Sequence, residues 1–294
     1  MLRRMTTKVS VGGVIASPDE ARLSPLDRGF LYGDSVYEVL RTYGGRLFAL
    51  DEHLARLGRS AEAIALDLPA PASLEAELRR TLAAAGNAES YVRLQISRGV
   101  GAFGLDPALS TEPTTVVIVR ELTPPPPETY TRGVVASIVG RLRNPRAALD
   151  PGAKTGNYLN NLLALREAKA DGANEALLRD AEGRLTEGAT SNVFAVHGGV
   201  VTTPPLATGL LDGVTRAHVL LLCRELGIRA RELDLRPAEL AAADEAFLTS
   251  SVRELVPIVE LRGAVQGRIG TGAPGPISLR LHGAYRAAAL KAAR

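Results

Sequence analysis

Two residues of this 294-residue chain suit one particular chemistry. Lys154 lies in the glycine-flanked segment 152–156, and Glu187 opens the polar run EGATSN ahead of a strand-like stretch. A lysine amine can form a Schiff base with an aldehyde cofactor, and a buried carboxylate can keep a pyridinium nitrogen protonated. A surface lysine and a turn glutamate are the ordinary alternatives, and spacing alone leaves both open.

A phosphate group could be bound at two further places. In LLDGVTR, Gly213 opens a predicted helix whose first turn contains Thr215, and the free backbone N–H groups of a helix start bind phosphate. Simple capping by Asp212 is the alternative, and the two interpretations are compatible with each other. Arg56 lies on an amphipathic helix. Its guanidinium fork suits phosphate, but spacing alone favours a solvated surface charge.

Composition excludes several classes of protein. The chain is 46% hydrophobic, has a net charge of +3 spread along its length, and contains a single cysteine, Cys223. It has no basic stripe typical of nucleic-acid binding and no apolar run of about 20 residues to span a membrane. The four histidines lack metal-ligand spacing. The lone cysteine and a basic N-terminus without an apolar signal region predict a cytoplasmic protein.

The run PPPPE at residues 124–128 predicts a domain boundary, because consecutive prolines interrupt helices and central strands. We expect a small α/β domain over residues 1–123, a linker over 124–130 and a larger domain over 131–294. Apolar periodicity predicts a mixed α/β fold. The expected strands are 8–16, 91–97, 115–122, 133–139, 175–179, 192–196, 200–203 and 245–249. The expected helices are 51–66, 75–85, 158–170, 213–226 and one at the C-terminus, which follows a loop over 263–276.

Seven sequence blocks, in order, carry a resemblance to a known family. They are DRGFLYGDSVYEVLRTY, DEHLARL, YVRLQISRG, KTGNYLNNLLALREA, LTEGATSNVFAV, TGLLDGVTR and FLTSSVREL, and they fall between about residues 11 and 257. Together they resemble the fold-type IV pyridoxal-phosphate enzymes, which include branched-chain aminotransferases, D-amino-acid aminotransferases and aminodeoxychorismate lyases. The resemblance implies pyridoxal 5'-phosphate as cofactor, no metal, a large pseudo-barrel-like cofactor-binding domain, and a homodimer with shared active sites.

The resemblance also assigns roles to residues. Lys154 matches the catalytic Schiff-base lysine that moves the substrate proton, and Glu187 matches the partner of the pyridine nitrogen. The remaining matches concern the cofactor's phosphate, ring face and ring oxygen. The phosphate contacts are Arg56, Gly213, Val214, Thr215 and Ser251, the ring contact is Leu211, and the ring-oxygen partner is Tyr158.

Four residues resemble the substrate pocket of branched-chain aminotransferases, namely Tyr32, Tyr37, Tyr91 and Arg93. The resemblance implies that Tyr91 and the backbone N–H groups near Ser251 and Val252 bind the α-carboxylate. Arg93 would accept the side-chain carboxylate of glutamate. Tyr32 and the loop over residues 100–106 would be donated across the dimer interface.

The leading hypothesis is a ping-pong transaminase that uses hydrophobic L-amino acids and 2-oxoglutarate. A D-amino-acid aminotransferase is an alternative, since VYEV at residues 36–39 matches it equally well. However, GAFG at residues 101–104 replaces the Arg-x-His of those enzymes, which also counts against an aminodeoxychorismate lyase with its polyanionic substrate. Outside the enzymes, the alternative is a non-catalytic phosphate-ligand binding module.

Overall fold

The computed structural model describes residues 7–110 and 112–292, which form two compact units. Unit 1 comprises Met1–Thr123, Ala153–Asn157 and Leu290–Arg294, and unit 2 comprises Pro124–Gly152 and Tyr158–Ala289. Each unit contains one sheet with helices, so the predicted mixed α/β fold is confirmed. The segment that carries Lys154 belongs to unit 1, although the chain on either side of it belongs to unit 2.

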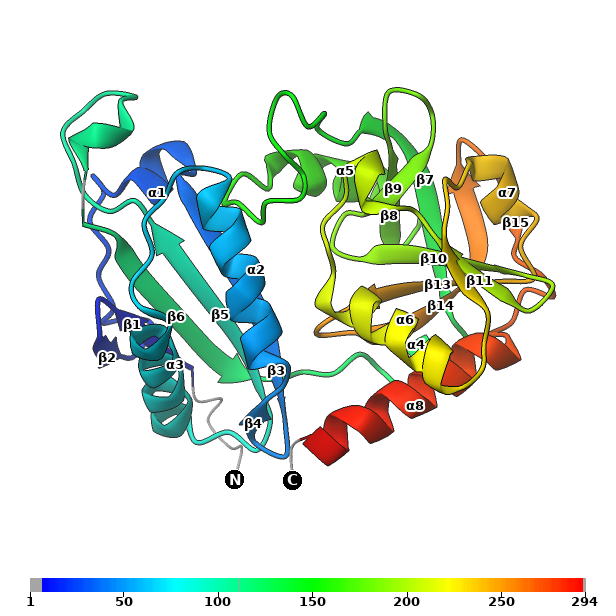
Figure 1. Cartoon of the computed structure of the whole chain (residues 1–294), viewed down its shortest axis with the longest axis horizontal. Coiled ribbons are helices and arrows are strands. Elements are labelled where there is room, and N and C mark those ends of the chain that lie inside the picture. Colours follow the sequence, from blue (N-terminus) through cyan, green and yellow to red (C-terminus); the bar gives the residue numbers. More distant parts are fainter. Residues whose placement is uncertain (1–6, 111, 293–294) are drawn as a thin grey trace. The chain divides into compact units, whose positions relative to one another are not determined.

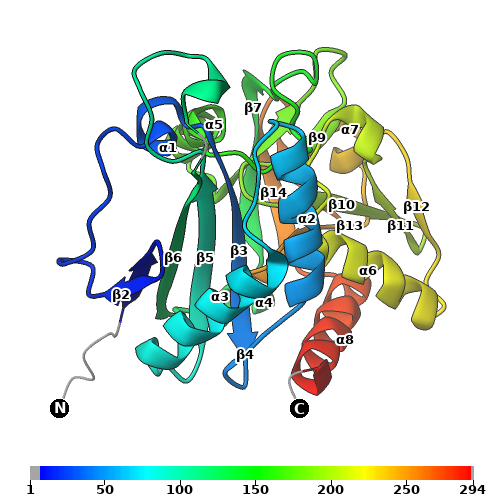
Figure 2. The same cartoon turned by 60° about the vertical axis from the view of Figure 1, so that its left-hand side comes forward.

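The sheet of unit 1 is antiparallel throughout, in the order β2-β1-β6-β5-β3-β4. Helices α2 (Leu50–Glu62) and α3 (Pro71–Ala85) cover one of its faces (Figures 1 and 2). Helix α3 starts on a proline and stops at Gly86, whose positive φ of 62° ends the helix without strain. The strands of unit 1 are β1 (Lys8–Val11), β2 (Val14–Ala16), β3 (Ser35–Tyr43), β4 (Arg46–Leu47), β5 (Ser90–Ser97) and β6 (Thr114–Glu121), and the unit also contains helix α1 (Arg28–Tyr32).

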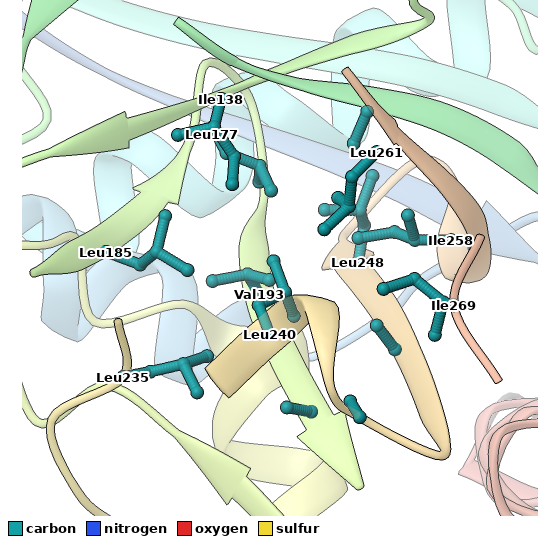
Figure 3. Close-up of a cluster of buried hydrophobic side chains, with 14 of the residues drawn as sticks. Ile138, Leu177, Leu185, Val193, Leu235, Leu240, Leu248, Ile258, Leu261 and Ile269 are labelled. Atoms are coloured by element: carbon teal, nitrogen blue, oxygen red, sulfur yellow. The ribbon is translucent and has the colours of Figure 1, made fainter. Parts of the chain in front are cut away.

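The sheet of unit 2 is mixed, in the order β12-β11-β10-β13-β14-β7-β8-β9, with β15 paired to β14. One core lies where β7, β8, β10, β13 and β14 contribute the branched side chains shown in Figure 3. A second core packs α5 against β7 and β8. The strands are β7 (Val134–Leu142), β8 (Glu175–Arg179), β9 (Leu185–Gly188), β10 (Asn192–His197), β11 (Val200–Thr203), β12 (Ala230–Glu232), β13 (Glu245–Ser250), β14 (Glu254–Gly263) and β15 (Gly267–Arg268). The helices are α4 (Glu128–Thr131), α5 (Leu159–Ala170), α6 (Val214–Glu225), α7 (Pro237–Ala241) and α8 (Pro276–Ala292).

Three differences from the predicted elements have physical causes. The strand expected over residues 8–16 is a hairpin, because Gly12 and Gly13 take positive φ angles of 55° and 84° and turn the chain. The expected loop over 263–276 contains β15. Strands β3, β4, β9, β12 and β14 are additional to those expected, and β14 includes Pro257, which lies one residue before pairing with β7 begins at Ile258. Among the described residues, no helix is long and apolar enough to cross a membrane.

Candidate active site

The segment around Lys154 is fixed within unit 1 by three hydrogen bonds of its backbone. The Lys154 carbonyl accepts from Tyr37 N at 2.9 Å, and the Lys154 N–H donates to Ser60 Oγ at 2.9 Å. Gly156 N donates to Ser35 O at 2.7 Å, and Thr155 forms an antiparallel bridge to Val36. A Cβ on Gly156 would lie 2.3 Å from Ser35 Oγ, so only glycine allows this approach. The segment therefore behaves as a short extra strand beside β3.

The Lys154 amine lies over an aromatic ring that also contacts an arginine. Lys154 Nζ is 4.5 Å from the centroid of the Tyr37 ring, and Arg93 Cζ is 3.8 Å from the same centroid. Gln95 of β5 pairs with Tyr37 of β3, so side-chain alternation places Arg93 and Tyr91 on this same face of the sheet. The structure thus brings together three of the predicted site residues: Lys154, Tyr37 and Arg93.

The other two predicted substrate residues of unit 1 have arginine neighbours. The half-buried Tyr91 ring lies 4.5 Å from Arg120 Cζ, and the half-buried Tyr32 ring of α1 lies 5.1 Å from Arg28 Cζ. Arg28 also donates to Gly104 O at 2.8 Å, which ties the loop after β5 to α1.

Arg56 lies on the opposite, helix-covered face of β3, in a buried ion pair. Its Nε and Nη2 bind the two oxygens of Glu38 at 2.7 and 2.6 Å, and His53 Nδ1 lies 2.7 Å from Glu38. Burial opposes ionisation of Glu38, but the Arg56 charge and the hydrogen bonds outweigh it and hold its pKa at about 2. Burial also lowers the pKa of His53. Arg56 is therefore buried and ion-paired, not the solvated surface charge that its spacing suggests.

In unit 2, Glu187 of β9 is buried and held at both oxygens. Arg143 Nε donates to Oε1 at 2.7 Å, and Leu211 N donates to Oε2 at 3.1 Å. Arg143 also reaches Asn161 Oδ1 and Pro151 O, both at 3.4 Å. No spacing signal marks Arg143 in the sequence, because its role depends on the fold bringing the end of β7 beside β9.

The start of α6 is a glycine. Gly213 is the N-cap residue and has no side chain to cap the first turn. A Cβ on Gly213 would lie 1.9 Å from Asn192 Oδ1, while Asn192 Nδ2 donates to Leu211 O at 2.9 Å. The buried first-turn residues Val214 and Thr215 follow. Leu211 links this helix start to Glu187, and the backbone N–H groups of a helix start suit an anionic group.

Ser251 and Val252 occupy the turn between β13 and β14 and are half-buried. Arg253, the next residue along this turn, forms an ion pair with Glu175, and its Nη2 donates to Thr190 Oγ1 at 2.8 Å. Next to the turn, the buried Thr249 Oγ1 has no hydrogen-bond partner within the described part of the chain. A hydrogen-bonding ligand at this turn would satisfy it. Tyr158, predicted to contact the cofactor, is the half-buried N-cap residue of α5.

Residues 35–261 match the family model described as Amino-transferase class IV. The match spans both units and includes Lys154, Glu187 and the start of α6. The chain therefore belongs to the class IV aminotransferases, and it is an enzyme of that kind.

Individual relatives come from several branches of the family. The chain is 38% identical over 88% of its length to a Methanocaldococcus jannaschii protein named "Putative branched-chain-amino-acid aminotransferase", covering 89% of that protein. It is 35% identical to a D-alanine aminotransferase of Bacillus licheniformis, with 92% and 93% of the two chains covered. It is 34% identical to an aminodeoxychorismate lyase of Bacillus subtilis, with 86% of each chain covered.

Among solved structures, a branched-chain amino acid aminotransferase from the organism abbreviated T.th., with pyridoxamine 5'-phosphate, superposes with a TM-score of 0.91. It is 31% identical, and the match covers 98% of this chain and 95% of that one. The expected fold-type IV architecture is thus confirmed.

Proposed function

We propose that this protein is a pyridoxal-phosphate-dependent transaminase that moves an amino group between hydrophobic, branched-chain L-amino acids and 2-oxoglutarate by a ping-pong mechanism. One observation carries the choice of substrates. Lys154 Nζ and Arg93 Cζ lie 4.5 and 3.8 Å from the centroid of the buried Tyr37 ring. The ring suits an aliphatic side chain, and the guanidinium suits a carboxylate.

The residues present fit the cofactor. The start of α6, where a Cβ on Gly213 would meet Asn192, would hold the phosphate through the N–H groups of Val214 and Thr215. Glu187 would hold the ring nitrogen, and Lys154 would bind the carbonyl carbon. The remaining proposed contacts come from residues on other elements, namely Arg56, Tyr158, Leu211 and Ser251.

The bound cofactor supplies an electron sink for the carbanion that forms at the substrate α-carbon. Lys154, with its backbone fixed beside β3, would take the proton from that carbon and return it to the acceptor's carbon. Glu187, fixed by Arg143, would hold a proton at the ring nitrogen. Tyr91 and the N–H groups of Ser251 and Val252 would bind the α-carboxylate.

A D-amino-acid specificity is the second candidate, because a D-alanine aminotransferase is among the relatives. The loop at residues 101–104 is GAFG and contains no charged side chain that could bind a carboxylate. Adding L-leucine and D-alanine separately and following the bound cofactor's absorbance would separate the two. A faster change with D-alanine would overturn the L-specificity. Release of pyruvate from aminodeoxychorismate without an amino acceptor would instead indicate a lyase.

The test of the enzyme itself is the visible absorbance of the purified protein incubated with pyridoxal phosphate. We expect a band that borohydride bleaches, and Lys154→Ala should lose the band and at least about 10³-fold of turnover, since nucleophile and base disappear together. Lys169→Ala, at an exposed lysine of α5, is the matched control and should behave as wild type. A colourless wild type, or an active Lys154→Ala, would overturn the proposed mechanism and favour the non-catalytic phosphate-ligand binding module.

We also propose a cytoplasmic homodimer. Phe30, Phe103 and Leu105 of unit 1 are 70%, 76% and 80% exposed, and Arg28 holds the loop that carries two of them. Large exposed apolar side chains grouped in this way mark association surfaces. Sedimentation of wild type and of Phe103→Ser with Leu105→Ser should give a dimer and a weakened dimer, respectively; a monomeric wild type contradicts the proposal.

A further inference from the structure

We propose that Gln95 is a positioning residue that sets substrate specificity, because it orients the Arg93 guanidinium without neutralising its charge. Arg93 can then bind an acidic substrate side chain in one half-reaction and release it for an aliphatic one in the other. The inference rests on the proposed function and goes further, in naming the residue that lets one pocket alternate between two substrate classes.

The contact geometry orients the arginine. Arg93 Nε and Nη2 both donate to Gln95 Oε1, at 3.1 and 2.9 Å. The Gln95 amide is fixed in turn, because its Nε2 donates to Ser35 Oγ at 3.1 Å. Ser35 is fully buried at the start of β3, where Gly156 approaches it closely. One edge of the guanidinium is therefore held by a side chain that is itself anchored to the Lys154 segment.

The sheet register explains why these groups meet. Gln95 pairs directly with Tyr37, and Arg93 precedes Gln95 by two residues on the same face of β5. The Tyr37 ring therefore covers one face of the guanidinium at 3.8 Å. With one face on the ring and one edge on Gln95, Nη1 is the nitrogen of Arg93 that makes no hydrogen bond within the described residues.

The charge environment of the half-buried Arg93 differs from that of three buried arginines of unit 1, which are paired with carboxylates. Arg28 and Arg98 bind Asp34 at 3.2 and 2.8 Å, and Arg56 binds Glu38. Arg93 has no carboxylate within ion-pair distance in residues 7–110 and 112–292. A neutral amide uses two of the five donors and leaves the positive charge available to a ligand.

A carboxylate at position 95 would change this balance. It would form a permanent bidentate pair with Arg93, so an incoming acidic side chain would meet a neutralised arginine. An aliphatic substrate would lose little binding affinity, since a guanidinium on an aromatic ring is weakly hydrated and tolerates apolar neighbours. Gln95→Glu should therefore discriminate between the two substrate classes.

The experiment compares wild type, Gln95→Glu and the matched control Gln266→Glu, which makes the same change at an exposed glutamine of unit 2. Each cofactor-loaded protein reacts with L-glutamate alone and with L-leucine alone. For Gln95→Glu we expect kcat/KM with glutamate to fall about 10- to 100-fold, mainly through KM, and the value with leucine to stay within about threefold. The control should match wild type with both.

A second variant and a binding measurement keep the test decisive if Gln95→Glu folds poorly. Gln95→Met keeps the volume but loses the hold on Arg93, and should weaken the equilibrium binding of 2-oxoglutarate by about 3- to 10-fold. Equal losses with both amino acids, or no change in either variant, would overturn the role of Gln95 while leaving the transaminase intact. A wild type that reacts with leucine but not with glutamate would instead overturn the proposed acceptor.

Discussion

Each unit buries a glutamate against an arginine, and the two pairs use their carboxylates differently. Glu38 in unit 1 accepts two contacts from Arg56 and one from His53, and its side chain is fully buried. Glu187 in unit 2 accepts one contact from Arg143 and one from a backbone N–H. A carboxylate has about four acceptor positions. Side chains use three of these positions on Glu38, whereas Glu187 uses two and keeps more capacity for another donor. The comparison predicts that Glu38 serves stability and Glu187 serves chemistry.

The largest expected effect is on the chemical side of this comparison. Glu187→Gln should lower turnover about 10²- to 10³-fold, because the proposed partner of the ring nitrogen loses its charge. Its loss of stability should be smaller than that of Glu38→Gln, since Glu187 accepts one contact from its arginine and Glu38 accepts two. Single-turnover rates and thermal unfolding, measured on the same preparation, would test both statements. A folded, fully active variant would remove the distinction between the two glutamates.

For Glu38 we expect the main loss to be in stability. Glu38→Gln leaves Arg56 buried with half of its pairing, and loss of one partner of a buried ion pair typically costs about 3–5 kcal/mol of unfolding free energy. Denaturant unfolding measures this loss. Glu260→Gln, at a partly exposed glutamate paired with Arg262, is the control and should change the unfolding free energy by less than about 1 kcal/mol. A Glu38 variant as stable as the control would contradict the structural role.

A smaller change should sharpen the assignment of Glu187. Arg143→Lys keeps the positive charge but loses the planar fork that also reaches Asn161 and Pro151. We expect turnover to fall by about 3- to 10-fold, with most of the loss in kcat, because Glu187 is less rigidly held. A loss confined to KM for the amino acid would instead place Arg143 in substrate binding.

The smallest expected effect is the pH dependence of stability that comes from Glu38 and His53 of unit 1. The pKa of Glu38 is depressed to about 2, so its contribution to stability is complete above its ordinary pKa of 4.5 and is lost as the pH falls toward 2. The pKa of His53 is also lowered, so the unfolded chain gains protons first as the pH drops below 6.5, again destabilising the fold. Unfolding free energies measured from neutral to acidic pH should therefore decrease for wild type, and less steeply for Glu38→Gln.

The elements that sequence periodicity found are those in which apolar spacing is regular, such as α2, α3, β5 and β6. Strand β3 was not predicted, because Glu38 and Arg41 interrupt its apolar pattern, and Glu38 finds its partners His53 and Arg56 only in the fold. Strand β14 was missed because Pro257 argues against a strand. In both cases tertiary pairing satisfies groups that look unfavourable in isolation.

The candidate site divides along similar lines. Lys154, Glu187 and the α6 start are recognisable because their motifs are local in the sequence. Arg143 and Asn192 act through partners that lie 44 and 19 residues away, so no local pattern could identify them. Gln95 could have been inferred, since period-two alternation on β5 places it beside Arg93.

The assignment of Ala153–Asn157 to unit 1 has a consequence for how the protein is made. Ribosomal synthesis delivers residues 1–123 first, and nascent domains generally fold as soon as they are complete. Unit 1 must wait for a segment that emerges only after the first strand of unit 2, since Tyr37, Ser35 and Ser60 find backbone partners there. Lys154 is thus among the last residues of its own unit to leave the ribosome, so its backbone takes its position only when that unit is complete.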